Sequence, residues 1–395
     1  MRRIGLIRDR FLSKEELYNI VVYLCRSEKR NHWTFSMYRQ WNRFLGDLDG
    51  NLDKIYNDLK NQCYVFHPFN IFVRYENGKK RVIYASGPED QIVDNVLDHA
   101  LKYVFMERKK IIHPNCYGSI KGKGQHELRT RVIRKVRGRR NLWAAVCDTH
   151  HYYPTIKHDI MMSYLKEHIK DSWCLWLCEE TIKRMPGTEG MALGLASSNI
   201  LGHVYHAAVD WSMIVEYGVR NYYRFCDDKI MIDDDPKFLH SMVRVLRGKI
   251  EGEMGQGLKP NWKVVWCGGK ERFEFLGAWI NSENARLKTP SRRRIEGRFK
   301  KELRLPFDIQ RQEDRDRIQR SWAGVRGGLK GLSIDNLIRY WRDVSYPEYF
   351  KRLKQIDAYK DQIKKKKTLE RFCGTYNPVE NVICQNYIPS QQIIP

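Results

Sequence analysis

The sequence predicts an α+β protein with an antiparallel sheet, and three observations support that prediction. Between residues 142 and 280, strand-like and helix-like apolar patterns follow one another in the order strand, helix, helix, hairpin, helix, strand. Of the 395 residues, 42% are hydrophobic and 12% aromatic, which is enough for a sizeable core. At roughly 150 residues per domain, the length allows two or three domains.

The charge balance points to nucleic acid as the partner. Lys and Arg number 71 against 47 Asp and Glu, which gives a net charge of +24. Phosphate neutralisation requires such an excess, whereas binding to a membrane surface would require a dominant amphipathic basic helix that the sequence lacks. No stretch of 18 apolar residues occurs, no apolar segment follows the basic N-terminus, and the ten cysteines include no CxxC pair. We therefore expect a cytoplasmic protein with reduced thiols, no membrane contact and no zinc site of the usual spacing.

The first 60 residues predict helices. Ser13 and Glu16 have the spacing of a capping box, and apolar residues follow at helical intervals. Three aromatic residues of this part are expected to anchor its packing: Trp33, Trp41 and Phe44. Residues 70–84 then predict a β-hairpin, because two β-rich runs flank the turn-forming pair Asn77-Gly78.

The remaining elements are predicted in order along the chain. The pattern indicates a helix over 90–107, a Gly- and Lys-rich loop over 113–124, an Arg-rich helix over 126–138 and a buried strand over 141–147. It then indicates helices over 159–183, 194–217 and 237–251, two strands around an acidic turn over 222–232, and strands over 263–280. From residue 291 the chain becomes basic and helical, and we expect little order in the polar tail that ends it.

Three aspartates are candidates for a catalytic metal site. Asp148 ends the predicted buried strand, and Asp227 and Asp228 lie in the acidic turn. If these strands are neighbours in one sheet, three carboxylates meet at one edge, as two-metal phosphoryl transfer requires. An Asp pair alone is often an ordinary turn, and residues 233–235, which precede Pro236, are expected to be such a solvated turn.

The order of the motifs around these aspartates resembles that of the reverse transcriptases. FCDD, which ends at Asp228, resembles their YxDD box, and DTHHYYPTI, which starts at Asp148, resembles their D-x-x-x-[FY]-[FY]-P-[ST]-I box. LGLASSN (193–199), LKPNWKV and FLG (275–277) fit further boxes in the same order. The resemblance covers roughly residues 70–290 and implies a right-hand polymerase. Its parts would be an N-terminal helical segment (1–60), fingers (61–145), a palm (146–290), a helical thumb (291–345) and a basic C-terminal extension (346–395).

The resemblance also implies a set of catalytic and metal-binding residues. It implies two Mg²⁺ ions, with Mn²⁺ as the alternative. The implied ligands are the carboxylates of Asp148, Asp227 and Asp228 and the backbone carbonyl of Thr149. Lys263, in LKPNWKV, would be a catalytic proton donor to the departing pyrophosphate.

A second set of residues would bind the substrate. By the resemblance, Arg81 would clamp the triphosphate and the ring of Tyr153 would exclude a 2′-hydroxyl, which selects dNTPs. Lys121, in the Gly-rich loop, could add a phosphate contact or belong to a solvated basic loop. Gly194 and Ser198 are small enough for template and primer to approach closely. Strand alternation puts Tyr152 and Tyr153 on opposite faces, so at least one of them is expected to pack.

One residue indicates a particular subgroup of the reverse transcriptases. Leu193, an aliphatic residue before Gly194, resembles the reverse transcriptases of diversity-generating retroelements, which copy a template RNA with frequent errors at adenine. This resemblance implies template RNA, a primer, an RNA–DNA hybrid, dNTPs and a small basic accessory protein as partners. Asn199 and the long C-terminal tail depart from that group. The alternative is a bacterial anti-phage (antiviral) defence reverse transcriptase that works with a structured non-coding RNA.

Other classes fit the sequence less well. An inactive nucleic-acid-binding module is disfavoured because all three aspartates are present. An RNA-dependent RNA polymerase is disfavoured by Tyr153 and by Phe225-Cys226 where Gly usually precedes Asp-Asp. A maturase-like splicing factor would carry an added domain, of which the sequence has no motif. Basic residues of 126–140 and 292–301 are expected to bind the RNA–DNA hybrid through its phosphates. For Lys364–Lys367 two interpretations stay open, a binding site for structured RNA or a protein partner and a solvated helix face.

Overall fold

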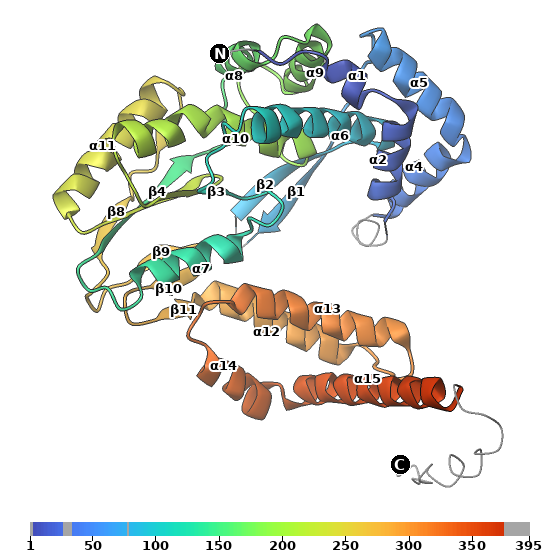
Figure 1. Ribbon diagram of the computed structural model, residues 1–395, viewed down its shortest axis with the longest axis vertical. Coiled ribbons are helices and arrows are strands. Elements are labelled where there is room, and N and C mark those ends of the chain that lie inside the picture. The colour runs from blue at the N-terminus through green and yellow to red at the C-terminus, as the bar shows by residue number, and fades with distance from the viewer. Residues whose placement is uncertain (1–2, 27–33, 77–78, 375–395) are drawn as a thin grey trace. The chain divides into compact units, whose positions relative to one another are not determined.

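The structure is a computed structural model of the chain, and it describes residues 3–26, 34–76 and 79–374. The chain forms two compact units, Met1–Ala285 and Arg286–Pro395 (Figure 1). The division falls close to the boundary between residues 290 and 291 that the sequence suggests for palm and thumb. The assignment of fingers, palm and thumb itself stays a prediction.

The N-terminal part is helical, as the sequence predicts. Its described helices are α1 (Ile7–Phe11), α2 (Lys14–Leu24), α4 (Phe35–Gly46) and α5 (Leu48–Lys60). The Ser13 hydroxyl accepts a hydrogen bond from the backbone N–H of Glu16 at 3.0 Å, which satisfies a free donor at the start of α2. Trp41 and Phe44 are buried, as predicted, whereas Trp33 lies outside the described residues.

The predicted hairpin and the helix after it are confirmed. Strands β1 (Asn70–Glu76) and β2 (Lys79–Ala85) pair antiparallel, and the turn expected at Asn77-Gly78 lies outside the described residues. Helix α6 (Pro88–Lys102) continues into a π-helical turn, η1 (Tyr103–Arg108). The apolar face predicted for this helix is fully buried: Ile92, Val93, Val96, Leu97 and Leu101.

A six-stranded sheet lies at the centre of the first unit. Its order is β3-β5-β6-β4-β7, and β8 also pairs with β4. The strands are β3 (Cys116–Tyr117), β4 (Trp143–His150), β5 (Tyr222–Phe225), β6 (Asp228–Asp233), β7 (Gly257–Leu258) and β8 (Lys263–Trp266). Every pair is antiparallel except β3–β5, which is parallel. The α+β class and the mainly antiparallel sheet are therefore confirmed.

Five helices complete the first unit between β3 and the second sheet, of which α7 and α11 contact strands of the central sheet. They are α7 (Gln125–Val136), α8 (His158–His168), α9 (Ser172–Lys183), α10 (Ala196–Trp211) with the π-helical turn η2 (Ser212–Glu216), and α11 (Pro236–Gly252). Helix α10 packs along α6 (Figure 1). The single helix predicted over 159–183 is wrong. The chain breaks before α9 because Asp171 caps that helix, accepting from the Cys174 N–H at 3.0 Å, and also binds the Ile7 N–H at 2.7 Å.

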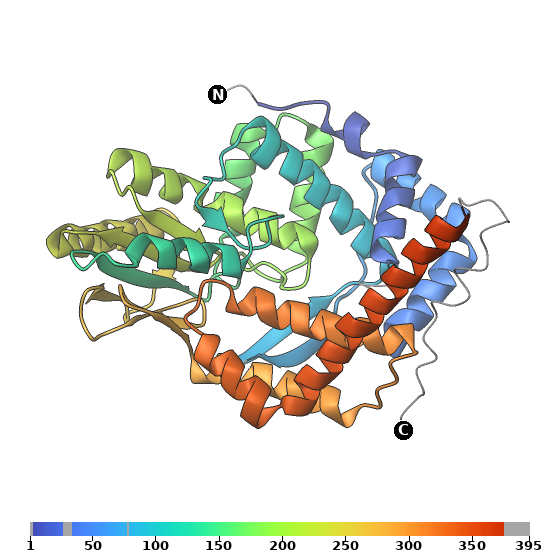
Figure 2. The same ribbon diagram turned by 60° about the horizontal axis from the view of Figure 1, so that its bottom comes forward.

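A second sheet has the order β11-β10-β9, with β9 (Phe273–Phe275), β10 (Ala278–Ile280) and β11 (Ala285–Leu287). The second unit is helical, with α12 (Thr289–Arg304), α13 (Gln312–Leu329), α14 (Asp335–Tyr340), the π-helical turn η3 (Trp341–Ser345) and α15 (Pro347–Gly374). Helix α15 packs on α12 and α13 (Figure 2). Phe299 centres an aromatic core there, with ring centroids 5.4 Å from Trp341 and 4.6 Å from Tyr349.

Two further sequence expectations concern the whole chain. None of the helices within the described ranges is both long and apolar enough to cross a membrane. The cysteines whose side chains the structure describes are free thiols. Residues 347–374 of the C-terminal extension are helical, and the polar tail after residue 374 lies outside the described part of the chain.

Candidate active site

The sheet brings the three candidate aspartates together. Strands β4 and β6 pair so that Asp148 lies directly opposite Asp228. Asp227 lies in the turn between β5 and β6, and its carbonyl accepts a hydrogen bond from the Thr149 N–H at 3.1 Å. Residues that are far apart in the sequence thus occupy neighbouring positions at one end of two paired strands.

The close approach of these carboxylates is electrostatically unfavourable. Burial, followed by the nearby carboxylates of Asp227 and Asp148, raises the pKa of Asp228 to about 7. Burial and Asp148 also raise the pKa of Asp227. Because like charges and burial both penalise ionised carboxylates, a bound cation would relieve the strain of this cluster.

The donor set fits a hard divalent cation. Asp148 Oδ1 is buried without a hydrogen-bond partner, and carboxylate oxygens are the ligands that Mg²⁺ prefers. However, within the described ranges no three His, Cys, Asp or Glu side chains are already arranged to hold a metal ion. Asp148 Oδ2 instead faces the ammonium group of Lys259, with which it forms an ion pair. A cation could bind Oδ1 beside this ion pair, whereas binding through both oxygens would require Lys259 to leave Asp148.

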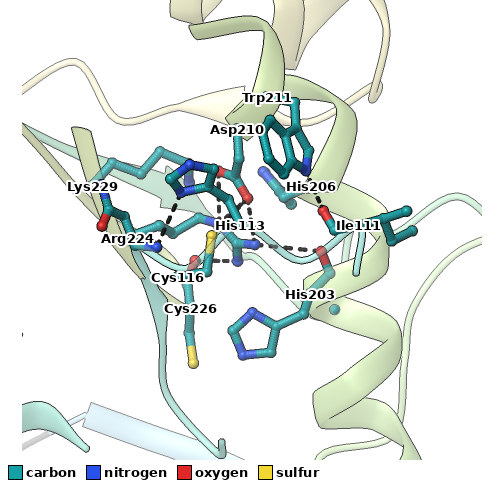
Figure 3. A network of polar contacts seen from close by, with 12 residues as sticks. Ile111, His113, Cys116, His203, His206, Asp210, Trp211, Arg224, Cys226 and Lys229 are labelled. Atoms are coloured by element: carbon teal, nitrogen blue, oxygen red, sulfur yellow. Dashed lines mark hydrogen bonds and ion pairs between the residues drawn. The ribbon is translucent and has the colours of Figure 1, made fainter. Parts of the chain in front are cut away.

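Arg224 supports the acidic turn from the buried side of the sheet (Figure 3). Cys226 has the left-handed φ of +51°, which is unfavourable for a residue other than glycine. The Arg224 guanidinium donates to the Cys226 carbonyl at 3.3 Å and to the Tyr152 hydroxyl at 3.1 Å. It also forms a fully buried ion pair with Asp210, whose nearest oxygen lies 2.7 Å away. Arg224 therefore fixes the turn and the tyrosine beside it.

Asp210 extends this support to the strands and to the Gly-rich loop. Its carboxylate accepts hydrogen bonds from the Tyr222 hydroxyl at 2.8 Å and the Cys116 thiol at 3.1 Å. At the middle of α10, two helical turns before Asp210, His203 Nε2 lies 2.7 Å from the Gly118 carbonyl oxygen. Burial lowers the pKa of His203 to about 4, so the ring is neutral near neutral pH. The network in Figure 3 thus joins α10, β3 and β5 behind the turn.

Lys229 is the second buried cation behind the turn. Its ammonium donates to Thr149 Oγ1 at 2.6 Å and to the Asp227 carbonyl at 3.2 Å. It thereby links the two strands that carry the aspartates. Burial, and secondarily Arg224, lower the pKa of Lys229 to about 8. The Thr149 side chain is thus used to bind Lys229, and only its backbone carbonyl would serve as the metal ligand that the resemblance implies.

The two tyrosines after β4 have different environments. Tyr152 is buried and donates to the Gly202 carbonyl at 2.6 Å, so one member of the pair packs, as expected. The premise of strand alternation is wrong, however, because β4 ends at His150 and both tyrosines lie in the turn that follows. Tyr153 is half-buried, its ring stands edge-on to that of Tyr152 at 5.1 Å, and its hydroxyl donates to Asn199 Oδ1 at 3.2 Å. Burial, then Cys226 and Asp227, raise the pKa of Tyr153, which places this ring beside the acidic turn.

The predicted cationic residues lie on three separate elements. Arg81 is exposed on β2, and it lies close enough to Tyr153 to influence its hydroxyl electrostatically. Lys121 is exposed in the Gly-rich loop. Lys263 is exposed at the start of β8, opposite Val146, and strand alternation puts it on the same face of the sheet as Asp148. Lys263 is thus near the aspartates, but Lys259 is the lysine of this segment that contacts Asp148.

The small residues of LGLASSN have local structural roles. A Cβ atom at Gly194, where φ is +130°, would lie only 2.7 Å from the Tyr84 carbonyl oxygen. The adjoining Leu193 carbonyl accepts from the Tyr84 N–H at 2.9 Å, so this glycine allows close approach to β2. Ser198 is buried and donates to the Ala192 carbonyl at 2.8 Å. The small size of both residues is explained by packing within the protein, and their contact with template and primer stays a prediction.

Sequence reasoning missed several residues of this site. One of them carried a signal, since Lys229 is a charged residue within an otherwise apolar strand, next to Asp228. The remainder act through contacts between distant segments, which no local pattern reveals: Lys259, Arg224, Asp210 and the side chain of Asn199.

The comparisons with known proteins are limited to distant structural similarities. No family model matches the chain, and no curated protein matches it. A truncated apo telomerase from Candida tropicalis has 14% identity and a TM-score of 0.41, over 56% of this chain and 55% of that one. The Candida albicans telomerase in complex with a telomeric RNA fragment has 12% identity and a TM-score of 0.43, over 75% and 62%. Apo telomerase from Candida tropicalis has 12% identity and a TM-score of 0.41, over 56% and 48%. The chain thus spans about half to less than two thirds of these structures, and the function proposed below rests on the site itself.

Proposed function

We propose that the chain is an RNA-directed DNA polymerase, a reverse transcriptase that extends a primer by two-metal-ion nucleotidyl transfer. The observation that carries this proposal is the register of the sheet. Asp148 and Asp228 lie opposite each other, and Asp227 lies in the adjoining turn. These are the aspartates of the two motifs that resemble the reverse transcriptase boxes.

In this proposal, the three carboxylates and the Thr149 carbonyl hold two Mg²⁺ ions, or Mn²⁺ in their place. Such ions lower the pKa of a primer 3′-hydroxyl and neutralise charge on the triphosphate. Arg224 and Lys229 keep the Asp227 carboxylate in place through the backbone of its turn. Lys259 balances the charge of Asp148 through their ion pair. Lys263 is the proposed proton donor to pyrophosphate.

The incoming nucleotide is proposed to lie between the acidic turn and β2. Tyr153 would exclude a 2′-hydroxyl, and its half-buried position beside the turn supports that role. Arg81 would bind the triphosphate, because a guanidinium pairs with phosphate oxygens through two hydrogen bonds, and Lys121 would add a contact from the Gly-rich loop. Gly194 and Ser198 would contact template and primer through the backbone of their segment.

Template RNA, primer and the RNA–DNA hybrid are the proposed macromolecular partners, bound through their phosphates. Exposed cations on α12 suit this role: Arg293, Arg294, Arg298, Lys300 and Lys301. The Arg-rich helix α7 contributes less than its sequence suggests. Arg129 is buried and donates to the Leu276 carbonyl at 3.4 Å, because its face of α7 packs against the protein. Lys364–Lys367 of α15 are exposed and could bind structured RNA or a protein partner.

For the biological role, we propose error-prone copying of a template RNA in a diversity-generating retroelement, with a small basic accessory protein. The aliphatic Leu193 supports this subgroup. The alternative is an anti-phage defence enzyme that works with a non-coding RNA. Asn199 and the 28-residue helix α15 favour that alternative, because both depart from the retroelement pattern. Sequencing the DNA made from co-purified RNA separates the two, since adenine-directed errors are expected only of the retroelement enzyme.

The polymerase activity is tested by extending a DNA primer on an RNA template with dNTPs and Mg²⁺. We expect synthesis that stops with a chelator, and we expect Asp227→Asn to reduce it at least about 1,000-fold because a metal-binding carboxylate is lost. Asp234→Asn, which removes an exposed carboxylate elsewhere on the chain, is the matched control and is expected to be active. If Asp227→Asn supports synthesis at the normal rate, the proposed mechanism is wrong.

A further inference from the structure

We propose that Asn199 is a positioning residue for sugar selection, because its amide oxygen fixes the ring of Tyr153 and joins it to the Gly-rich loop. The inference rests on the proposed function, in which Tyr153 excludes the 2′-hydroxyl of a ribonucleotide. It adds a residue that touches neither the sugar nor the metal ions and acts through the orientation of the tyrosine.

Three segments meet at this amide oxygen. Asn199 lies in the first turn of α10, Tyr153 follows β4, and Ser119 belongs to the loop over 113–124. Asn199 Oδ1 accepts hydrogen bonds from the Tyr153 hydroxyl at 3.2 Å and from the Ser119 hydroxyl at 3.0 Å. An amide oxygen has two lone pairs, so both of its acceptor positions are used. The orientation of the Asn199 side chain is therefore determined by the two hydroxyls together.

The Gly-rich loop, which contributes Ser119, is fixed by contacts of its own. Ser119 has the left-handed φ of +53°, and the preceding Gly118 has φ +100°. His203 Nε2 lies 2.7 Å from the Gly118 carbonyl oxygen, and residues 199 and 203 lie one turn apart on the same face of α10. A Cβ atom at Gly118 would lie 2.6 Å from Cys226 Sγ, so the loop also lies directly against the acidic turn. Asn199 thus ties Tyr153 to a loop that two other contacts keep in place.

The packing of the Tyr153 ring explains why the hydrogen bond of its hydroxyl is needed to fix the ring's orientation. The ring packs against Tyr152 and against α10, where a Cβ atom at Gly202 would lie 3.3 Å from Tyr153 Cε1. These contacts hold one edge of the ring, whereas Asn199 holds its hydroxyl end. A ring that excludes a single hydroxyl group must keep its tilt, because a small rotation would open space for a 2′-oxygen. Loss of the bond to Asn199 should therefore relax sugar selection more than it weakens dNTP use.

The test measures kcat/KM for a dNTP and for the matching rNTP in single and double variants. Tyr153→Phe keeps the ring and removes its hydroxyl, and Asn199→Ala removes the acceptor. Each is expected to lower the ratio of dNTP to rNTP efficiency by about 3- to 10-fold, the range typical of one neutral hydrogen bond. The double variant is expected to lose no more than either single one, because both remove the same interaction.

Two further variants separate positioning from general damage. Asn199→Asp keeps an accepting oxygen and is expected to restore most of the discrimination that Asn199→Ala loses. Tyr164→Phe removes the hydroxyl of a half-buried tyrosine on α8 and should leave the ratio unchanged. Thermal melting of each variant identifies any that fails to fold.

The outcomes distinguish this inference from the proposed function. If the wild type makes DNA but Tyr153→Phe keeps full discrimination, or if the two single effects add, Asn199 does not position the tyrosine and the polymerase assignment still stands. If the folded wild type makes no DNA on any primed RNA template, the proposed function is wrong and the inference is overturned with it.

Discussion

Two groups of aspartates lie at opposite ends of strand β6, and they differ in the contacts that their carboxylates form. Asp227 and Asp228 lie at its start, half-buried and opposite Asp148, with the cations Arg224 and Lys229 behind them. At its far end Asp233 and Asp235 form local contacts: Asp235 accepts from the Lys237 N–H at 2.8 Å and so begins α11.

The difference shows what separates a reactive site from a helix cap. The far group satisfies its own backbone, since the Asp233 carboxylate accepts from the Asp235 N–H at 3.1 Å, and Asp234 is exposed to water. At the start of β6, ionisation of the carboxylates is unfavourable, because burial and neighbouring carboxylates raise the pKa of Asp228 to about 7. A protein retains such repulsion where a ligand of opposite charge relieves it. The two groups therefore differ in their electrostatic surroundings and in the contacts that support them. Single substitutions at each end of β6 test this difference.

Among the residues that support the aspartates, Lys229 should have the largest effect on activity when it is replaced. Lys229→Met removes the hydrogen bonds to Thr149 and to the Asp227 carbonyl while keeping most of the buried volume. We expect DNA synthesis to fall by about 10- to 100-fold, because about 1–3 kcal/mol is typical for a charged hydrogen bond to the turn that holds a catalytic group. Lys237→Met, at the far end of β6, is exposed and should leave the rate unchanged. Equal rates in both variants would show that the buried ammonium does not support the site.

Replacing Asp228 should stabilise the metal-free protein. Asp228→Asn removes one of the crowded carboxylates, and we expect the melting temperature at pH 8 to rise by about 2–4 °C for each kcal/mol of repulsion relieved. The folded protein holds a proton on Asp228 up to about pH 7, whereas the unfolded chain releases it near pH 4. Stability due to this group therefore falls as the pH rises from about 4 to 7, so the advantage of the variant should grow over that range.

The control for this prediction is Asp234→Asn, at the exposed end of the strand. Its melting temperature should change little at any pH, and it should keep wild-type activity. A stabilisation of Asp228→Asn that is the same at pH 4 and pH 8 would show that the carboxylates do not repel each other, because the repulsion requires an ionised carboxylate.

The smallest effect is expected at the helix cap. Asp235→Ala removes the side chain that accepts from the Lys237 N–H at the start of α11, and loss of such a cap costs about 1 kcal/mol. Denaturant unfolding should report that loss, whereas the rate of DNA synthesis should be unchanged once the protein is folded. A large loss of activity in folded Asp235→Ala would mean that both acidic groups serve the reaction.

Local patterns explain which parts of this architecture the sequence could predict. The hairpin over 70–84, the buried face of α6 and the strands around Asp227 follow from periodicity of two or 3.6 residues and from turn chemistry. The meeting of Asp148 with Asp228 followed from strand pairing across one sheet.

The errors and omissions concern contacts between distant segments. The break before α9 depends on Asp171, which binds both its own helix and the N–H of Ile7. The sequence singled out Lys263, but the geometry of the connection between β7 and β8 brings Lys259 to Asp148. The partners of Asn199 lie 46 and 80 residues away, so no local pattern could have identified them.

Direct measurement of cation binding tests whether Asp148, Asp227 and Asp228 form a metal site, and it needs neither template nor primer. Mn²⁺ binding is followed by electron paramagnetic resonance in the wild type, in Asp228→Asn and in Asp234→Asn. We predict that wild type and Asp234→Asn bind Mn²⁺ alike and that Asp228→Asn binds it at least about tenfold more weakly, since one carboxylate ligand is lost. Unchanged binding in Asp228→Asn, or its loss in Asp234→Asn, would contradict the claim that the buried turn is the cation site.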